Sequence, residues 1–163
     1  MKKKRQISLA FIGDAEVGKT AVIKMLDQNI DSKGTTFQLN TKEIAYTIWE
    51  LQTSSHEPQR LGVFAESFLK ESIPFDRFVI IVSDSSKNDV NKIKYSVKFL
   101  RQKFPDSRLA IIANKQDMND RLSKRKIERL IKLPTLELSA INQAHRERLL
   151  NFLSYLIESD TGL

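Results

Sequence analysis

Residues 13–20 read G-D-A-E-V-G-K-T, which places two glycines, a lysine and a hydroxyl residue at fixed spacing. Glycine lets a backbone curl so that several N–H groups point inward at one anion. The ammonium group of Lys19 can reach the outer phosphates of a nucleotide, and the hydroxyl of Thr20 can ligate Mg²⁺. The stretch matches the phosphate-binding pattern G-x-x-x-x-G-K-[ST] at every constrained position. We therefore predict a phosphate site here.

The segments on either side of this loop have the character of a strand and of a helix. Residues 7–12 form a short apolar run suited to a buried strand, and residues 21–26 are typical of a helix. A helix beginning at Lys19 would add the positive end of its dipole to the site. Strand, glycine loop and helix is the order that phosphate binding requires, and an ordinary strand–helix turn is the plainer alternative.

Polar residues follow two further predicted strands at their carboxyl ends, where open α/β sheets bind ligands. The predicted strand 109–113 continues into N-K-Q-D at residues 114–117, and the predicted strand 135–138 is followed by Ser139 and Ala140. With these motifs in this order, the sequence resembles the Ras-like small GTPases, most of all their Arf-like and prokaryotic members. The resemblance covers nearly the whole chain and implies that it binds GTP and GDP with Mg²⁺.

The resemblance also implies how the base is chosen. The Asp117 carboxylate suits the N1–H and N2–H₂ donors of guanine, and adenine offers neither donor on that edge. The aliphatic stem of Lys115 can cover one face of the base. Asn114 is expected to tie this loop to the phosphate loop, and the Ala140 N–H to meet guanine O6. A polar turn without a ligand is the alternative interpretation of residues 114–117.

These motifs define a complete set of expected ligand positions. The residues expected to bind the nucleotide are Asp14, Ala15, Glu16, Val17, Gly18, Lys19, Thr20, Ala21, Asn114, Lys115, Asp117, Ser139, Ala140 and Ile141. The residues expected to hold Mg²⁺ are Thr20, Thr35 or Thr36, and Glu50. Sequence does not choose between the two neighbouring threonines, and each is otherwise an ordinary β-branched strand residue.

The family pattern fails after the predicted strand 44–49. The family has D-x-x-G there, usually followed by glutamine, whereas this chain reads E-L-Q-T-S. Glu50 is one methylene longer than aspartate and could still hold a Mg²⁺-bound water. Thr53 keeps a backbone N–H, but its Cβ resists the conformations that glycine permits. Ser54 is too short to orient a water as glutamine would, so Ser54 and Gln52 are both kept as candidate catalytic residues.

Three other residues receive interpretations without a ligand. No arginine is obviously placed to act on the nucleotide within the chain, and Arg60 is interpreted as an exposed helix residue. His56 and His145 lack the spacing of metal ligands, so both are expected to face solvent.

Strand and helix patterns alternate along the chain, which predicts one α/β domain over residues 1–163. We expect a three-layer phosphate-loop NTPase fold, with a six-stranded, mostly parallel sheet and five helices on its two faces. A short turn at 40–42 implies an antiparallel hairpin. The remaining strands are expected at 78–82, 109–113 and 135–138. Helices are expected around 61–69, from a cap at Asn88 or Asp89, around 127–131, and at 149–157.

Composition limits where and how such a domain would work. The chain contains no cysteine, which excludes disulfides, thiolate metal sites, prenylation and palmitoylation, and Lys2 excludes myristoylation. Neither a membrane-spanning run nor a signal peptide is recognisable. We therefore expect a cytoplasmic protein without a stable membrane anchor.

The net charge of +7 is concentrated at residues 2–5 and 123–129. Such patches could meet nucleic acid or an anionic membrane. A solvated surface is the preferred interpretation, and nucleic acid is disfavoured, because no aromatic-interleaved RNA motif or helix-turn-helix pattern accompanies the charge.

The function predicted from sequence is a guanine-nucleotide switch that hydrolyses GTP slowly or not at all. Its expected partner is a protein effector or activator. A scaffold that holds nucleotide without switching, and a binder of nucleic acid or membranes, are the alternatives.

Overall fold

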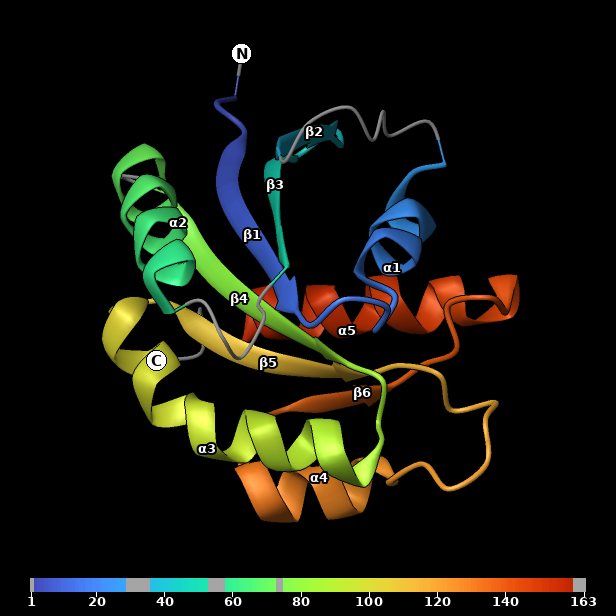
Figure 1. The fold of residues 1–163 in the computed structure, drawn as a ribbon. Helices are drawn as coiled ribbons and strands as arrows, with labels where there is room; N and C mark the ends of the chain where they lie inside the picture. The colour runs from blue at the N-terminus through green and yellow to red at the C-terminus, as the bar shows by residue number, and fades with distance from the viewer. Residues whose placement is uncertain (1, 29–35, 53–57, 73–74, 160–163) are drawn as a thin grey trace.

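Six strands form one sheet in the computed structural model, which describes residues 2–28, 36–52, 58–72 and 75–159 (Figure 1). The strands are β1 (Arg5–Gly13), β2 (Thr36–Asn40), β3 (Ile44–Gln52), β4 (Asp76–Ser83), β5 (Arg108–Ala113) and β6 (Thr135–Glu137). They lie in the order β2-β3-β1-β4-β5-β6. Only β2 pairs antiparallel among these strands, so the predicted mixed sheet is confirmed.

Helices cover both faces of this sheet. Within the described ranges they are α1 (Lys19–Leu26), α2 (Pro58–Glu71), α3 (Lys87–Lys103), α4 (Lys124–Ile131) and α5 (Arg146–Glu158), with a 3₁₀ turn η1 (Gln143–His145) before α5. Helices α1 and α5 share one hydrophobic cluster, and α2, α3 and α4 share the other. The expected three-layer arrangement is therefore present. None of the described helices is long and apolar enough to cross a membrane.

The central strand β1 joins the two hydrophobic clusters. Leu9 and Phe11 pack into the cluster beneath α1 and α5, whereas Ala10 and Ile12 pack into the cluster beneath α2, α3 and α4. Successive side chains on a strand point to opposite faces of the sheet. A parallel strand covered on both faces is therefore apolar at nearly every position, which explains the continuous apolar run in the sequence.

Strand β3 is longer than the sequence predicted. It continues past Trp49 to Gln52 because its parallel pairing with β1 continues, with Phe11 opposite Glu50 and Gly13 opposite Gln52. The predicted end of this strand at residue 49 was therefore wrong. The consequence is that Glu50 and Gln52 are held on the sheet beside the glycine loop.

The predicted cap of α3 was also wrong. Neither Asn88 nor Asp89 caps this helix, because Ser86 is its N-cap and accepts a hydrogen bond from the Asp89 N–H at 3.2 Å. Serine at the N-cap satisfies a backbone donor at the third helical position, which is the position that Asp89 occupies here. The Asp89 carboxylate is consequently turned into the protein.

Candidate functional site

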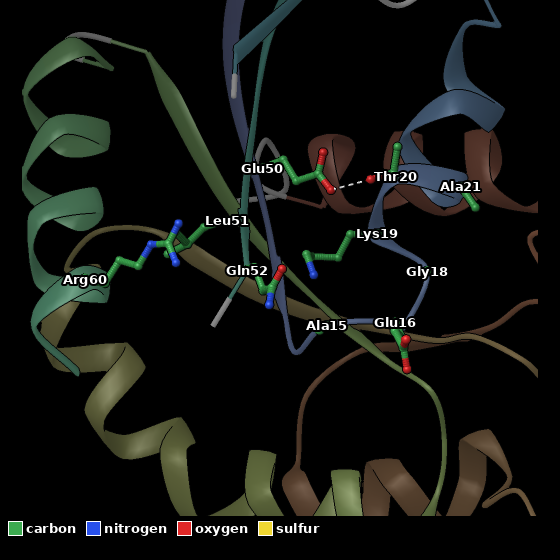
Figure 2. Close-up of a pocket in the computed structure, with 10 residues that line it drawn as sticks. All are labelled: Ala15, Glu16, Gly18, Lys19, Thr20, Ala21, Glu50, Leu51, Gln52 and Arg60. Atoms are coloured by element: carbon green, nitrogen blue, oxygen red, sulfur yellow. Dashed lines mark hydrogen bonds between the residues drawn. The ribbon is translucent and has the colours of Figure 1, made fainter. Parts of the chain in front are cut away.

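The glycine loop, the first turn of α1 and the end of β3 enclose a cavity of about 370 Å³ (Figure 2). A tenth residue, from α2, completes its lining. The lining residues are Ala15, Glu16, Gly18, Lys19, Thr20, Ala21, Glu50, Leu51, Gln52 and Arg60. Residues that the sequence analysis assigned to phosphate, metal and catalysis therefore share one cavity.

Both glycines of the loop are required by its shape. Gly18 has a φ of 97°, and a Cβ there would collide with the side-chain amide of Asn114. A Cβ on Gly13 would lie 2.5 Å from the carbonyl oxygen of Val82. Gly18 is also the N-cap of α1, and glycine has no side chain that could bond to the N–H groups at that helix end. These donors can serve an anion, so the loop fits a phosphate group.

Lys19 lies over the loop with its ammonium group bonded to the backbone. Its Nζ donates to the carbonyl oxygens of Gly13 at 2.9 Å and Asp14 at 2.8 Å. An ammonium group has three donors, so one remains beyond these two bonds. Burial lowers the pKa of Lys19, and the negative charges of Glu50, Asp14 and Asp89 oppose that shift. The loop thus carries a cation aimed at the position of the expected phosphates.

Thr20 and Glu50 meet in the same cavity. The Thr20 hydroxyl donates to Glu50 Oε1 at 2.6 Å, as Figure 2 shows. Hydroxyl and carboxylate oxygens are ligands that Mg²⁺ accepts, and this ion usually takes few protein groups beside substrate phosphates. The described residues contain no group of three or more histidine, aspartate or glutamate side chains suited to a metal. The pair therefore fits Mg²⁺ better than a metal held by protein alone.

The other expected metal ligands are not brought to this pair. Thr36 begins β2 opposite Trp49, is exposed, and does not line the cavity. Thr35 lies outside the described residues. The assignment of a threonine from this segment stays a prediction.

Two of the cavity's side chains bear on hydrolysis. Gln52 is exposed at the end of β3, and Arg60 extends toward it from α2 (Figure 2). Arg60 is exposed, as predicted, but sequence analysis missed its place in the cavity, because that place depends on how α2 packs against β3. Aromatic contacts set this packing: Trp49 on β3 meets Phe64 and Phe68 on α2 edge to face. Thr53, Ser54 and His56 lie outside the described residues.

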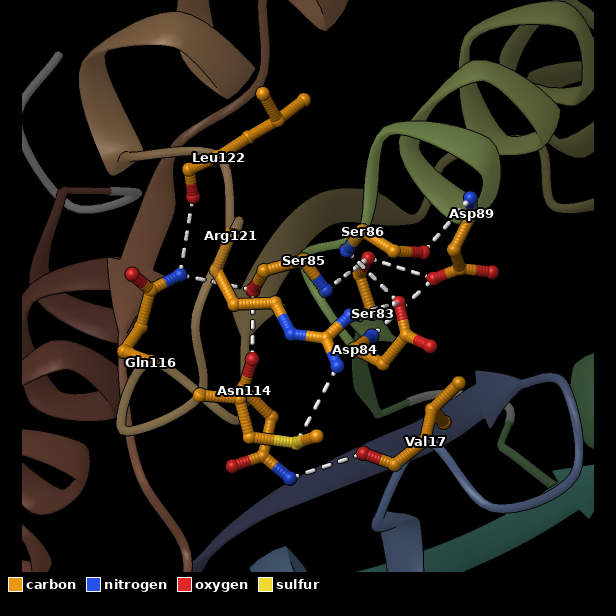
Figure 3. A network of polar contacts seen from close by, with 11 residues as sticks. Val17, Ser83, Asp84, Ser85, Ser86, Asp89, Asn114, Gln116, Arg121 and Leu122 are labelled. Carbon is orange, nitrogen blue, oxygen red and sulfur yellow. Dashed lines mark hydrogen bonds and ion pairs between the residues drawn. The ribbon is translucent and has the colours of Figure 1, made fainter.

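Asn114 joins the second motif, residues 114–117, to the glycine loop, as predicted. Its Nδ2 donates to the Val17 carbonyl oxygen at 2.9 Å (Figure 3). Its Oδ1 accepts a hydrogen bond from the Ala140 N–H at 2.9 Å. The N–H expected to meet guanine O6 is thus bonded to Asn114 in this structure, because one side-chain amide offers both a donor and an acceptor. The single buried residue Asn114 connects all three motifs.

Asp117 is exposed next to the third motif, which consists of Ser139 and Ala140. The Ser139 hydroxyl donates to Asp117 Oδ1 at 2.6 Å, and this bond is the main reason why the pKa of Asp117 lies below its ordinary value. A second cavity, of about 470 Å³, lies next to this pair. Its lining residues are Gln116, Asp117, Ser139, Ile141, Asn142, Gln143 and His145. An ionised carboxylate is therefore presented to a ligand at the edge of this cavity.

A network of hydrogen bonds holds the second motif in place (Figure 3). The Ser85 hydroxyl donates to the Asn114 carbonyl oxygen at 2.6 Å and accepts from Gln116 Nε2 at 2.8 Å. Gln116 Nε2 also donates to the Leu122 carbonyl oxygen at 3.0 Å. Ser85 was not predicted from the sequence, where the polar run after the β4 strand was the only signal for it. These protein contacts hold the loop in place.

Asp89, in the first turn of α3, is buried. Burial raises the pKa of Asp89, while hydrogen bonds from the Ser83 hydroxyl at 2.6 Å and the Asp84 N–H oppose the shift.

His145 was expected to face solvent, but it is half-buried, and its Nδ1 accepts the Ser139 N–H at 2.9 Å. That prediction was wrong because η1 turns the ring back toward Ser139.

The model of one protein family, described as the ADP-ribosylation factor family, matches residues 1–157. No curated protein matches the chain. The matched stretch contains the glycine loop, both later motifs and all the strands of the sheet.

Proposed function

Because the chain belongs to the ADP-ribosylation factor family of small GTP-binding proteins, we propose that it is a switch driven by Mg²⁺-bound GTP and GDP. The phosphates would occupy the cavity at Lys19, and the base would lie beside Asp117. The described residues that would respond to the γ-phosphate are those at the end of β3. Segments ordered by a γ-phosphate are the usual basis of such switches.

The observation that carries this proposal is the 2.9 Å bond from Asn114 to the Val17 carbonyl oxygen. It ties the loop that would bind the base to the loop that would bind the phosphates. A site for inorganic phosphate would need no such link. A nucleoside phosphate must reach both loops at once, so a fixed separation between them reduces the cost of ordering the site.

Asp117 supports guanine as the base. Its carboxylate is ionised at neutral pH, since the Ser139 hydroxyl stabilises the charge. A carboxylate accepts two N–H donors of guanine, whereas adenine would leave it facing a base without those donors. The expected result is strong discrimination against ATP.

Thr20 and Glu50 would hold Mg²⁺, directly or through a bound water, once the nucleotide is present. The ion, when bound, neutralises charge on the phosphates. The protein side chains do the rest: Lys19 supplies a second positive charge, and Thr20 and Glu50 hold their oxygens ready at the start of α1 and the end of β3.

We expect GTP hydrolysis to be slow. In that reaction a water attacks the γ-phosphorus, and the bond from phosphorus to the β–γ bridging oxygen breaks. Ser54 has too short a side chain to orient this water, and Gln52 lines the cavity from a position two residues earlier. Arg60 lines the same cavity and is a source of positive charge within the chain. A partner protein that completes the site is expected to accelerate turnover.

The cellular setting is also part of the proposal. A chain without cysteine suits the reducing cytoplasm and has no thiol for lipid attachment. We therefore expect a cytoplasmic protein whose partners are a guanine nucleotide and a protein effector or activator.

One observation favours a second function that depends on charge. Helix α3 carries six lysine or arginine residues with one acidic residue, and the adjacent α4 carries four with one acidic residue (Figure 1). Both acidic side chains make hydrogen bonds to the protein itself, Asp89 to Ser83 and Glu128 to the Thr135 N–H. An anionic partner that docks here would be released steeply by added salt.

Two measurements on the purified protein test the main proposal. Bound nucleotide is first extracted and quantified, and hydrolysis of loaded GTP is then followed over a single turnover. Bound guanine nucleotide with slow turnover supports the switch. Bound nucleotide that neither exchanges nor turns over indicates a scaffold, and the absence of guanine-nucleotide binding overturns the proposal.

A further inference from the structure

The turn between β6 and α5 is closed on itself by a histidine. The Ser139 N–H donates to His145 Nδ1 at 2.9 Å. The Asn142 N–H donates to the Ser139 carbonyl oxygen, and the His145 N–H donates to that of Asn142, both at 2.9 Å. Ser139 and His145 are therefore joined both through the backbone of the turn and through the imidazole.

Ser139 also leads directly to the proposed base site. Its hydroxyl donates to Asp117 at 2.6 Å, and the N–H of the next residue, Ala140, donates to Asn114 at 2.9 Å. Asp117, Ser139 and His145 line the same cavity of about 470 Å³. A shift of the Ser139 backbone would consequently move a partner of Asp117 and a partner of Asn114 together.

The bond to His145 requires one protonation state. A ring nitrogen that accepts a hydrogen bond carries no proton, so Nδ1 must be bare and the proton must lie on Nε2. Protonation of the ring would place an N–H on Nδ1 opposite the N–H of Ser139. The two donors would repel each other, and the turn would lose the contact that closes it.

From this geometry we infer that neutral His145 is a positioning residue for guanine-nucleotide binding, an inference that rests on the proposed function. Its Nδ1 holds the Ser139 backbone, and Ser139 in turn holds Asp117 in place for the base. His145 itself lines the cavity and need not touch the nucleotide. Guanine-nucleotide affinity should therefore depend on the acceptor at Nδ1 and should decrease when that acceptor is protonated.

Charged side chains lie on the loop and the helix next to His145. Asp117 lines the cavity that His145 also lines. The guanidinium of Arg146, the next residue, donates to the carbonyl oxygens of Met25 and Leu26. Glu147 lies in the first turn of α5, and Lys24 and Asp27 lie at the end of α1, which Arg146 contacts. Asp117 has a lowered pKa, so it stays ionised through mildly acid conditions.

The test is calorimetric titration of Mg²⁺-GDP into four proteins at pH 7.5 and pH 5.5. The proteins are wild type, His145→Asn, His145→Ala and His56→Asn. Asparagine presents an amide oxygen close to the position of Nδ1 and does not titrate, whereas alanine removes the acceptor. His56→Asn replaces the other histidine of the chain and is the matched control. GDP itself titrates in this range, so each ratio is taken between proteins at one pH.

At pH 7.5 we expect His145→Asn to bind GDP like wild type, and His145→Ala to bind on the order of tenfold more weakly. At pH 5.5 wild type and His56→Asn should both bind more weakly than His145→Asn, again on the order of tenfold. If His145→Ala does not fold, the comparison of wild type with His145→Asn across pH still decides the question.

The outcomes separate this inference from the proposed function. If the ratio of wild-type to His145→Asn affinity is the same at both pH values, or if His145→Ala binds like wild type, the positioning role is wrong while GDP binding stands. If wild type binds no GDP at pH 7.5, the proposed function fails, and this inference fails with it.

Discussion

The hydroxyl of Thr20 and the carboxylate of Glu50 form a 2.6 Å hydrogen bond between the first turn of α1 and the end of β3. In the parallel register of β3 with β1, Glu50 lies opposite Phe11, which places its side chain near the carboxyl end of β1, where the glycine loop leads into α1. The family motif has aspartate at this position, and glutamate reaches the same hydroxyl from the extended strand. The chain therefore keeps a hydroxyl–carboxylate pair where Mg²⁺ is expected.

Replacing Glu50 with glutamine tests whether this pair serves the metal. Glu50→Gln keeps the length of the side chain but removes its charge, so the gain in GDP affinity on adding Mg²⁺ should fall by about tenfold or more. GDP dissociation constants with Mg²⁺ and with EDTA measure this gain. Glu50→Asp, which keeps the charge, should retain most of it. A full Mg²⁺ effect in Glu50→Gln would contradict the assignment.

Lys19→Ala should remove most of the thermal stabilisation that the nucleotide provides. A ligand at about 1,000 times its Kd adds roughly 4 kcal/mol to the stability of the folded protein, which raises Tm by roughly 10 °C for a domain of this size. Lys92→Ala is the matched control, since Lys92 pairs with the Asp14 carboxylate at 3.2 Å from an exposed position. Differential scanning fluorimetry with Mg²⁺-GDP measures both. Equal increases for Lys19→Ala and Lys92→Ala would contradict the role of Lys19.

Restoring the family residues after β3 should accelerate hydrolysis. In Thr53→Gly with Ser54→Gln, glycine frees the backbone and glutamine can orient the attacking water, so single-turnover GTP hydrolysis should rise above the wild-type rate. If wild type already turns over as fast as a GTPase with its activator bound, Ser54 is not the catalytic position and Gln52 becomes the residue to change.

Arg60→Ala should lower whatever hydrolysis the wild type has, by about tenfold or more, because an arginine that reaches the γ-phosphate stabilises transition-state charge. Arg125→Ala, on the exposed side of α4, is the control and should leave the rate unchanged. Equal single-turnover rates for Arg60→Ala and wild type would exclude a contribution from Arg60.

Asp89 gives a prediction about stability and pH. Because burial raises its pKa, the folded chain holds this proton more tightly than the unfolded chain does. Asp89 therefore stabilises the folded protein below the unfolded pKa near 4, and this stabilisation is lost as the pH rises through the folded pKa. Asp89→Asn does not ionise and can keep both hydrogen bonds through its amide oxygen. At pH 7 it should melt at the same temperature as wild type or higher.

The same comparison at acid pH supplies the check. The Tm difference between Asp89→Asn and wild type should shrink as the pH falls toward 4, and Asp106→Asn, at an exposed position, should show no such trend. A markedly lower Tm for Asp89→Asn at pH 7 would mean that the ionised carboxylate stabilises the fold.

The sheet and the glycine loop were predictable because their physical constraints are local. Strands such as β4 and β5 are buried on both faces and appear as continuous apolar runs. A loop that turns with positive φ against a neighbouring amide needs glycine at that position, as at Gly18. The loop is therefore recognisable from the sequence.

The features that sequence analysis missed depend on contacts between distant or folded-back segments. The extension of β3 to Gln52 follows from its register against β1. The place of Arg60 follows from the packing of Trp49 against α2. His145 accepts a backbone N–H only because η1 reverses the chain, and a lone histidine in a polar stretch gives no sign of that.

The central claim is that the chain binds guanine nucleotides through Asp117. Titration of the nucleotide-free protein with Mg²⁺-GDP and Mg²⁺-ADP tests it most directly. We predict that wild type binds GDP at least roughly a thousandfold more tightly than ADP, because an unpaired carboxylate would face adenine. Asp117→Asn should lose this preference and gain affinity for the xanthine nucleotide. Equal wild-type affinity for GDP and ADP would contradict the claim.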